Sequence, residues 1–161
     1  TFVLERIAKL WDAPLVSVDI DDRAEVGSYS RRRFVRMDDI AFAAQFPAWC
    51  AAQGLPAAID ILFVDTSHLY GHTGAEIKGW FPYLADRCKV VFHDTNLREV
   101  FTRKDGSEGR GWDNERGVIR SIEDWFGMDF DETKDFVLEK NGWLIRHWGH
   151  CNGLMILDRY F

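Results

Sequence analysis

Two short apolar runs, each followed by acidic or imidazole side chains, constrain the fold of this chain most strongly. The first covers residues 59–64 and is followed by Asp65, and the second covers residues 89–92 and is followed by His93 and Asp94. Short runs with an apolar middle are typical of central parallel strands that helices cover on both faces. In an open α/β sheet, ligands bind at the carboxyl ends of such strands. The two runs therefore predict a parallel sheet with a functional site at its carboxyl edge.

Helical and extended patterns alternate along the rest of the chain. Residues 1–11 carry an apolar stripe typical of a helix, and residues 15–20 read as a short buried strand. A strand is expected over 33–36, followed by a helix over 40–53 that stops at Gly54. Two more helices are expected over 74–85 and 118–126. The last strands are expected over 135–139 and 153–160, with a turn at Asn141-Gly142 between them. This alternation predicts an α/β fold with a mainly parallel sheet and helices on both faces.

Length and composition limit the class of protein. A chain of 161 residues suits one domain, and no apolar run approaches the roughly 20 residues that span a bilayer. The formal charge of −6 argues against a broad surface for nucleic acid, although residues 31–36 include a local basic cluster. The three cysteines lack metal-ligand spacing, which fits a reducing compartment. We therefore expect a single cytoplasmic domain, residues 1–161, that binds neither membranes nor nucleic acid; a homo-oligomer is compatible with the sequence.

Charged and glycine-rich sequence fills residues 98–117 and follows the strand that ends at His93 and Asp94. Such sequence offers little apolar surface to offset the entropy of ordering, so we expect a mobile lid over the cleft. Its basic residues are candidates for contact with an anionic or polyhydroxy substrate; they are Arg103, Lys104, Arg110 and Arg116.

Two aspartates after the earlier strands are candidates for binding a nucleoside. Asp19 lies at the end of an apolar strand, where a carboxylate can accept the hydroxyl hydrogens of a ribose. The alternative is an aspartate that caps a turn or a helix. Asp38 follows the next strand and can accept from an adenine amino group, while Asp39 can cap the helix that begins at Ile40; these two roles can also be exchanged.

The side chains that follow the two strong strands suit metal or base chemistry. Asp65 and Asp94 supply hard oxygen donors that can hold a divalent cation, and His93 adds a nitrogen donor. His68 can accept a proton from a hydroxyl at neutral pH. The structural alternative is that His68 caps a turn and that His93 hydrogen-bonds to backbone.

Four motifs occur in order along the chain: IDILFVDTSHLY at 59–70, WFPYL at 80–84, VVFHDT at 90–95 and NGLMIL at 152–157. Together they resemble the class I S-adenosylmethionine-dependent methyltransferases, in the group of the cephalosporin-hydroxylase-like proteins and the macrolide-sugar and rhamnosyl O-methyltransferases. The resemblance implies a Rossmann-like sheet with an antiparallel last strand. It also implies that the first strand and the glycine-rich cofactor loop lie upstream of Thr1.

The resemblance further implies a function and a set of site residues. S-adenosylmethionine would be held by Asp19 at the ribose and Asp38 near the adenine, with Asp65 also at the cofactor; Asp65, His93 and Asp94 would hold magnesium, and His68 would act as the base. The methyl acceptor would be a hydroxyl of a sugar or another small polar metabolite. Two departures weaken magnesium in favour of a transition metal, because the family's Asp-Gly is Asp65-Thr66 here and an acidic metal position is His93. Two alternatives are a non-catalytic nucleoside-binding module and a nicotinamide-dependent oxidoreductase, although the latter lacks a visible tyrosine-lysine pair.

Overall fold

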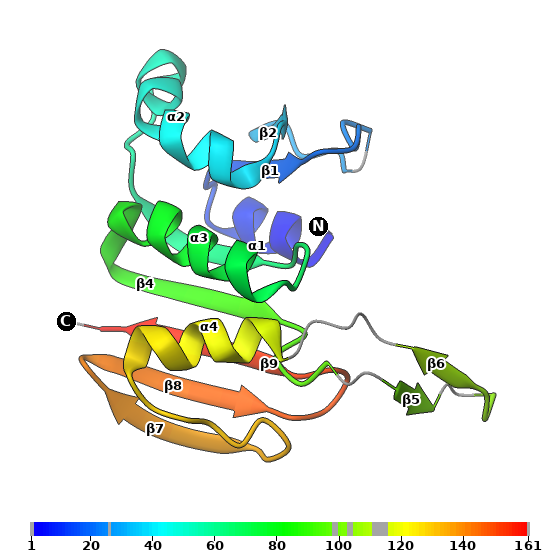
Figure 1. Cartoon of the computed structure of the whole chain (residues 1–161). Helices are drawn as coiled ribbons and strands as arrows, with labels where there is room; N and C mark the ends of the chain where they lie inside the picture. The colour runs from blue at the N-terminus through cyan, green and yellow to red at the C-terminus, as the bar shows by residue number, and fades with distance from the viewer. Residues whose placement is uncertain (1, 26, 98–99, 103–104, 111–115, 161) are drawn as a thin grey trace. The chain divides into compact units, whose positions relative to one another are not determined.

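A computed structural model describes residues 2–25, 27–97, 100–102, 105–110 and 116–160, which form two compact units, Thr1–Pro56 and Ala57–Phe161. Figure 1 shows the elements of both units. Each unit alternates helices and strands, as expected for the α/β class.

The first unit holds two helices and a pair of parallel strands. Its elements are α1 (Phe2–Leu10), β1 (Leu15–Asp19), β2 (Arg32–Arg36) and α2 (Asp39–Gln53). Leu15 pairs with Arg32 at the start of the ladder, and Asp19 pairs with Arg36 at its end. Helix α2 contributes most of the buried apolar side chains of this unit, namely Phe42, Ala43, Phe46 and Cys50. These bounds lie within one or two residues of those that the sequence predicts.

The two ends of α2 show one correction and one confirmation. The side chain of Asp38 accepts a hydrogen bond of 2.8 Å from the amide of Ala41, so Asp38 is the N-cap. For the cap, the exchanged assignment that the sequence left open therefore holds: Asp39 is the first residue of the helix, which begins one residue earlier than expected. Gly54 ends the helix with φ at 68°, in the left-handed conformation that favours glycine.

The second unit holds the strands with polar ends. Its elements are β3 (Ile59–Val64), α3 (Tyr70–Trp80), a short 3₁₀ helix (Phe81–Tyr83), β4 (Leu84–His93), β5 (Val100–Thr102), β6 (Glu108–Arg110), α4 (Gly117–Phe126), β7 (Phe136–Lys140), β8 (Trp143–Trp148) and β9 (Leu154–Arg159). Five of these strands form one sheet in the order β3-β4-β9-β8-β7, and β5 pairs with β6 alone.

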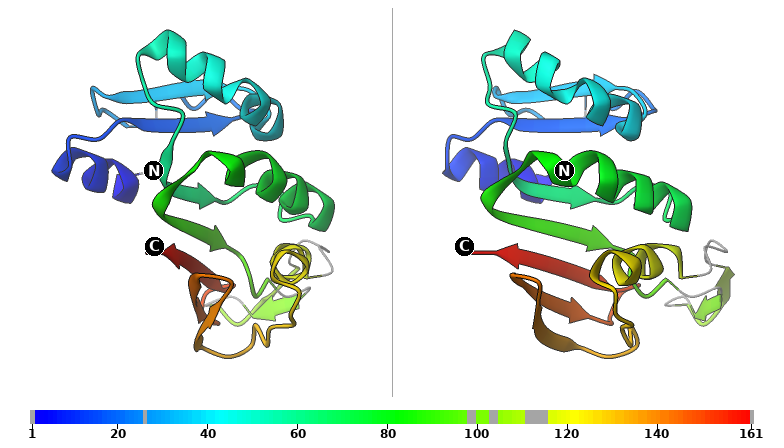
Figure 2. Two further views of the ribbon diagram at one scale, coloured as in Figure 1. Left: turned by 90° about the vertical axis from the view of Figure 1, so that its left-hand side faces the viewer. Right: turned by 60° about the vertical axis from the view of Figure 1, so that its left-hand side comes forward.

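Strand directions in the sheet confirm the Rossmann-like α/β class with an antiparallel last strand. Strands β3 and β4 are parallel, with Val64 opposite Phe92, so their carboxyl ends meet at one edge. The last strand, β9, runs antiparallel to β4, with Leu157 opposite Val90. Helices α3 and α4 lie along the same face of this sheet (Figures 1 and 2).

The core of the second unit lies between this face and the two helices. Its fully buried side chains alternate along the central strands with side chains on the opposite face, as the pleat requires. They are Val90, Phe92, Ile145, Met155 and Leu157 from the sheet and Ile119 and Ile122 from α4. Burial of this many large apolar groups is the main force that holds the sheet and helices together.

Three elements depart from the sequence predictions. Helix α3 spans Tyr70–Trp80 rather than residues 74–85, because Pro82 lies in the 3₁₀ turn and Leu84 already begins β4. Strand β8 was not predicted, although its side chains alternate between buried and more exposed positions. Strands β5 and β6 form a hairpin within the expected lid, while its residues 98–99, 103–104 and 111–115 lie outside the described part of the chain.

Among the described residues, no helix is both long enough and apolar enough to cross a membrane.

Candidate active site at the ends of two parallel strands

The polar residues that follow β3 and β4 lie together. Ligand atoms of Asp65, His68 and Asp94 all lie within 4.8 Å of one another. The parallel pairing of β3 and β4 explains this convergence, because Asp65 directly follows one strand and Asp94 the other. The expectation that the two carboxylates approach a common point is confirmed.

Two imidazoles join these carboxylates. Nε2 of His68 lies 3.2 Å from Oδ1 of Asp65 and 3.0 Å from Oδ2 of Asp94. Nδ1 of His93 lies 3.5 Å from Oδ1 of Asp65 and 3.2 Å from Oδ1 of Asp94. Both rings thus face the two carboxylates. The alternatives, in which His68 caps a turn and His93 bonds to backbone, do not include these contacts. We call Asp65, His68, His93 and Asp94 the strand-end cluster.

Two atoms of the strand-end cluster are buried without a hydrogen bond. Nδ1 of His93 and Oδ1 of Asp94 have no hydrogen-bond partner among the described residues, although they lie 3.2 Å apart. Buried polar atoms are seldom left unpaired, since each costs about 1–3 kcal/mol. A carboxylate oxygen and an imidazole nitrogen side by side, each with a lone pair available, can both coordinate a cation.

Two residues of the strand-end cluster that contact each other, His68 and Asp94, have an unusual backbone conformation. His68 has φ at 61° and Asp94 has φ at 56°, in the left-handed region that side chains other than glycine rarely adopt. Such conformations cost of order 1–3 kcal/mol each and persist only where the surrounding structure enforces them. The neighbours of these two residues are therefore part of the site.

Helix α4 holds the turn that carries His68. A Cβ atom on Gly117 would lie 2.4 Å from the carbonyl oxygen of His68 and 2.5 Å from the amide nitrogen of Tyr70. Only glycine permits this close approach of the helix to the turn. The hydroxyl of Ser121, one turn further along α4, donates to the carbonyl of Tyr70 at 2.7 Å.

Thr66, which stands where the resembling families have glycine, makes a specific contact of its own. Its hydroxyl donates to Oε1 of Glu76 at 2.8 Å, and the side chain of Glu76 is buried. The substitution therefore anchors the residue after Asp65 to helix α3, and it does not remove the carboxylate from the cluster.

The electrostatics of the cluster keep Asp65 charged. The hydrogen bond with His68 is the main cause that lowers the pKa of Asp65, and His93 lowers it further; partial burial works in the opposite direction. Asp65 is thus a carboxylate at neutral pH, as a metal ligand or a partner of an imidazolium must be.

The nucleoside candidates belong to the first unit and already have local partners there. Oδ1 of Asp19 accepts from the amide of Asp21 at 2.9 Å, and its Oδ2 lies 4.0 Å from Nε of Arg23. Asp38 caps α2. Asp19 thus caps a turn and Asp38 caps a helix, as the alternatives to nucleoside binding state. Contact of either residue with a nucleoside stays a prediction.

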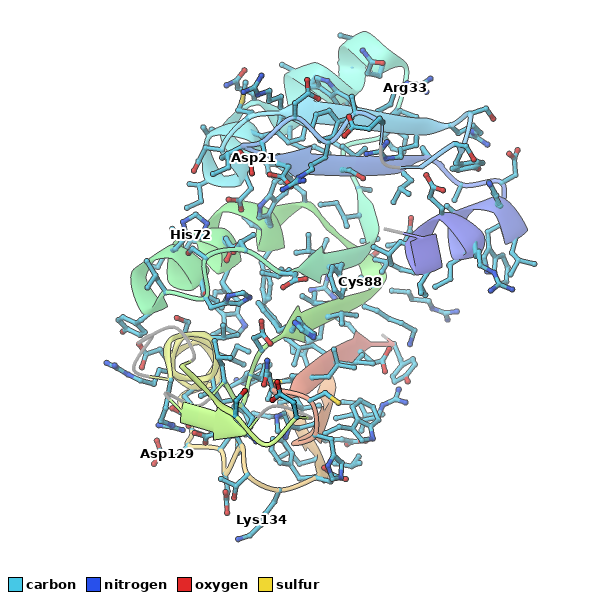
Figure 3. The ribbon with its side chains drawn as sticks, turned by 90° about the vertical axis from the view of Figure 1, so that its right-hand side faces the viewer. Asp21, Arg33, His72, Cys88, Asp129 and Lys134 are labelled. Atoms are coloured by element: carbon cyan, nitrogen blue, oxygen red, sulfur yellow. The ribbon has the colours of Figure 1, made fainter. Side chains whose placement is uncertain are left out.

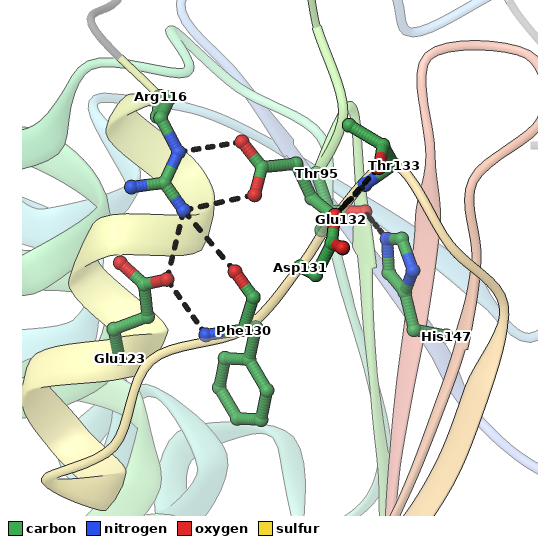
Figure 4. A network of polar contacts seen from close by, with 8 residues as sticks. All are labelled: Thr95, Arg116, Glu123, Phe130, Asp131, Glu132, Thr133 and His147. Atoms are coloured by element: carbon green, nitrogen blue, oxygen red, sulfur yellow. Dashed lines mark hydrogen bonds and ion pairs between the residues drawn. The ribbon is translucent and has the colours of Figure 1, made fainter.

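Arg116, one of the expected substrate contacts, is engaged within the protein. Its guanidinium binds Glu123 at 2.8 Å and Glu132 at 2.5 Å, and it reaches the carbonyl of Phe130 (Figure 4). These partners hold the pKa of Arg116 above its ordinary value, chiefly through Glu132. Arg116 therefore joins the start of α4 to the segment that follows the helix, while Arg103 and Lys104 lie outside the described residues.

Sequence reasoning missed a buried pair beside Asp94. The hydroxyl of Thr95 lies 2.9 Å from Nε2 of His147 (Figure 4). Nδ1 of the same ring lies 2.9 Å from the carbonyl oxygen of Lys134. The side chain of Lys134 points away from the fold at the surface (Figure 3). The sequence offers one indication of this pair. His147 occupies a position that the alternation of residues 143–148 predicts to be buried, but this follows only if that segment is recognised as a strand.

Comparison with known proteins gives a family and a set of similar folds. A model of a methyltransferase-domain family matches residues 1–95. An uncharacterized protein of Sinorhizobium fredii is 42% identical over 43 residues, which are 27% of this chain and 5% of that protein.

Two groups of solved structures resemble the chain in fold. A protein of Corynebacterium glutamicum matches with a TM-score of 0.53 at 13% identity, over 93% of this chain and 62% of that chain. The MycE methyltransferase of the mycinamycin biosynthetic pathway, solved in complex with Mg, SAH and mycinamycin VI, matches with a TM-score of 0.52 at 15% identity, over 91% of this chain and 36% of that chain. The chain thus spans less than two thirds of the length of these relatives, and at such low identity the likeness concerns the fold.

Proposed function

Because the chain belongs to the methyltransferase-domain family of class I S-adenosylmethionine-dependent enzymes, we propose that it transfers a methyl group from S-adenosylmethionine to a hydroxyl of a small polar molecule, such as a sugar. The observation that carries the proposal is the convergence of Asp65, His68 and Asp94 at the carboxyl ends of β3 and β4. This is the edge where open α/β sheets bind their ligands.

His68 is the proposed general base. Because the carboxylates can only accept, Nε2 carries the ring proton, and Nδ1 is the nitrogen that takes the proton of the acceptor hydroxyl. The hydroxyl oxygen attacks the methyl carbon as the bond between that carbon and the cofactor sulfur breaks. The carboxylates of Asp65 and Asp94, at 3.2 and 3.0 Å from Nε2, stabilise the imidazolium that results. Holding the acceptor in line with the methyl group contributes the rest of the rate enhancement.

A divalent cation fits the donor set of the cluster. Asp65, Asp94 and His93 would hold it, and the unpaired Nδ1 of His93 and Oδ1 of Asp94 are the atoms that coordination would satisfy. A bound cation supplies Lewis-acid polarisation of the acceptor hydroxyl. The solved MycE complex contains Mg, and the mixed oxygen and nitrogen donors here also suit Mn²⁺.

Three aspartates that come at or after the ends of strands are the proposed contacts of the cofactor. We propose that Asp19 accepts from the ribose hydroxyls, that Asp38 lies near the adenine and that Asp65 contributes at the cofactor as well as at the cation. In this proposal residues 1–161 belong to one cytoplasmic methyltransferase domain.

Titration with S-adenosylmethionine tests the function most directly, and the seven tryptophans provide a fluorescence signal. We expect saturable binding, and methyl transfer to a sugar hydroxyl that depends on Mn²⁺ or Mg²⁺. Binding without transfer to any tested hydroxyl would favour a non-catalytic nucleoside-binding module, and preference for a dinucleotide would favour an oxidoreductase.

The proposed cation is tested separately with Asp94→Asn. This variant keeps the size of the side chain but removes the charge, so we expect Mn²⁺ affinity to fall at least about tenfold. The matched control is Asp60→Asn, which changes an exposed aspartate of β3 outside the cluster. Equal Mn²⁺ affinity in both variants would contradict the cation site.

A further inference from the structure

His147 is a buried histidine that no step of the proposed reaction uses. Its side chain lies on β8, its exposed fraction is 1%, and both ring nitrogens make hydrogen bonds. Nδ1 contacts the carbonyl oxygen of Lys134 and Nε2 contacts the hydroxyl of Thr95, each at 2.9 Å.

The partners of His147 determine which nitrogen carries the proton. A backbone carbonyl can only accept, so Nδ1 of His147 must donate to Lys134. In the neutral imidazole, Nε2 then has a lone pair and accepts from the hydroxyl of Thr95. The ring also stacks on Phe136, with centroids 4.9 Å apart and planes at 19°, which fixes its orientation.

The turn between β8 and β9 packs against Thr95 on the side away from His147. A Cβ atom on Gly153 would lie 2.5 Å from Oγ1 of Thr95, and φ of Gly153 is 87°. The next residue, Asn96, donates from its backbone amide to the carbonyl of Asn152 at 2.5 Å and from Nδ2 to the carbonyl of Gly149 at 2.8 Å. The backbone that leaves Asp94 is therefore held by β8, through His147, and by the turn between β8 and β9.

We propose that His147 is a positioning residue which, through Thr95, fixes the direction of the Asp94 carboxylate in the strand-end cluster. Asp94 has φ at 56°, and the residue after it can enforce that conformation only if it is itself immobile. The hydrogen bond from Thr95 to His147 provides this restraint. The inference rests on the proposed function only in its use of cation binding as a readout.

The test compares two substitutions of Thr95 in the intact protein. Thr95→Val removes the hydroxyl and keeps the shape, whereas Thr95→Ser keeps the hydroxyl. We expect Thr95→Val to weaken Mn²⁺ binding, measured by electron paramagnetic resonance, about tenfold or more, as for other residues that orient metal ligands, and Thr95→Ser to bind close to the wild-type value. Ile145→Val on the same strand is the control for a general loss of stability.

A second readout does not depend on any cation. Because Nε2 of His68 lies 3.0 Å from Asp94, displacement of the carboxylate changes the ¹⁵N resonance of that ring. We expect a shift in Thr95→Val and in His147→Phe, and none in Thr95→Ser or Ile145→Val.

The possible outcomes separate this inference from the proposed function. Wild-type protein that binds no Mn²⁺ would remove the cation from the proposed function, and the resonance of His68 would then decide the role of His147. An unchanged His68 resonance in Thr95→Val, or an equal shift in Ile145→Val, would overturn the positioning role.

Discussion

Nε2 of His68 lies 3.0 Å from Oδ2 of Asp94, and both residues have a left-handed backbone, with φ at 61° and 56°. Each conformation is enforced by a different part of the second unit. Helix α4 packs through Gly117 against the turn of His68, while β8 and the turn between β8 and β9 hold Thr95 and Asn96 after Asp94. The site therefore depends on side chains that contact neither the acceptor nor the cofactor in the proposed reaction.

The first prediction concerns the base. His68→Gln keeps a polar side chain in the cluster but removes the imidazole, so we expect kcat to fall by roughly 10²–10⁴. Affinity for S-adenosylmethionine should change little, because His68 is not a proposed contact of the cofactor. The matched control is His150→Gln, which replaces an exposed histidine outside the cluster. Equal rates in the two variants, measured by methyl transfer, would remove His68 from the reaction.

The second prediction concerns the cofactor. Asp19→Ala should weaken binding of S-adenosylmethionine by roughly 1–3 kcal/mol, the cost of leaving the ribose hydroxyls without their partner. Asp22→Ala is the control, since Asp22 also accepts a hydrogen bond from the backbone amide two residues later, that of Ala24, but does not lie at the end of a strand. Tryptophan fluorescence measures both affinities. If both substitutions had the same effect, Asp19 would be a turn residue and nothing more.

Much of the cluster was predictable because a simple rule of topology places it. Once β3 and β4 are recognised as adjacent parallel strands, Asp65 and Asp94 must lie at the same edge of the sheet. The apolar composition of residues 59–64 and 89–92 was enough for that recognition. Proximity of His68 followed from its position three residues after Asp65.

The residues that hold the cluster were not predictable in the same way. His147 lies next to Thr95 because β8 pairs with β9 and β9 pairs with β4. The local periodicity of a sequence does not show which residues of distant strands lie opposite each other. Helix α3 was placed too late because its start at Tyr70 has no side-chain cap that a sequence could reveal. The role of Gly117 likewise depends on a close approach to a turn far away along the chain.

The third prediction concerns pH. Hydrogen bonds from Lys134 and Thr133 lower the pKa of Asp131 to about 2. Its contribution to stability is therefore complete above the unfolded value near 4 and is lost as the pH falls toward about 2. The difference in unfolding free energy between wild type and Asp131→Asn should be constant above about pH 5 and should shrink below about pH 4. Denaturant titrations across this range measure the difference, and one that does not change down to pH 2 would contradict the lowered pKa.

The fourth prediction concerns the contact between α4 and the turn of His68. Gly117→Ala places a methyl group 2.4 Å from the carbonyl oxygen of His68 and 2.5 Å from the amide of Tyr70, and neither backbone atom can move independently of the turn. We expect a loss of about 1–3 kcal/mol in the free energy of unfolding, as for other insertions into packed sites. Since the displaced backbone carries the proposed base, kcat should fall as well.

Gly71→Ala is the matched control for this contact. Gly71 lies in α3, and a Cβ atom there would meet nothing within 4 Å. Alanine is a better helix former than glycine, so this variant should be more stable by roughly 0.5–1 kcal/mol. Chemical denaturation of both variants gives the two changes, and methyl transfer gives the rates. A Gly117→Ala protein as stable and as active as Gly71→Ala would show that α4 does not hold the turn of His68 in place.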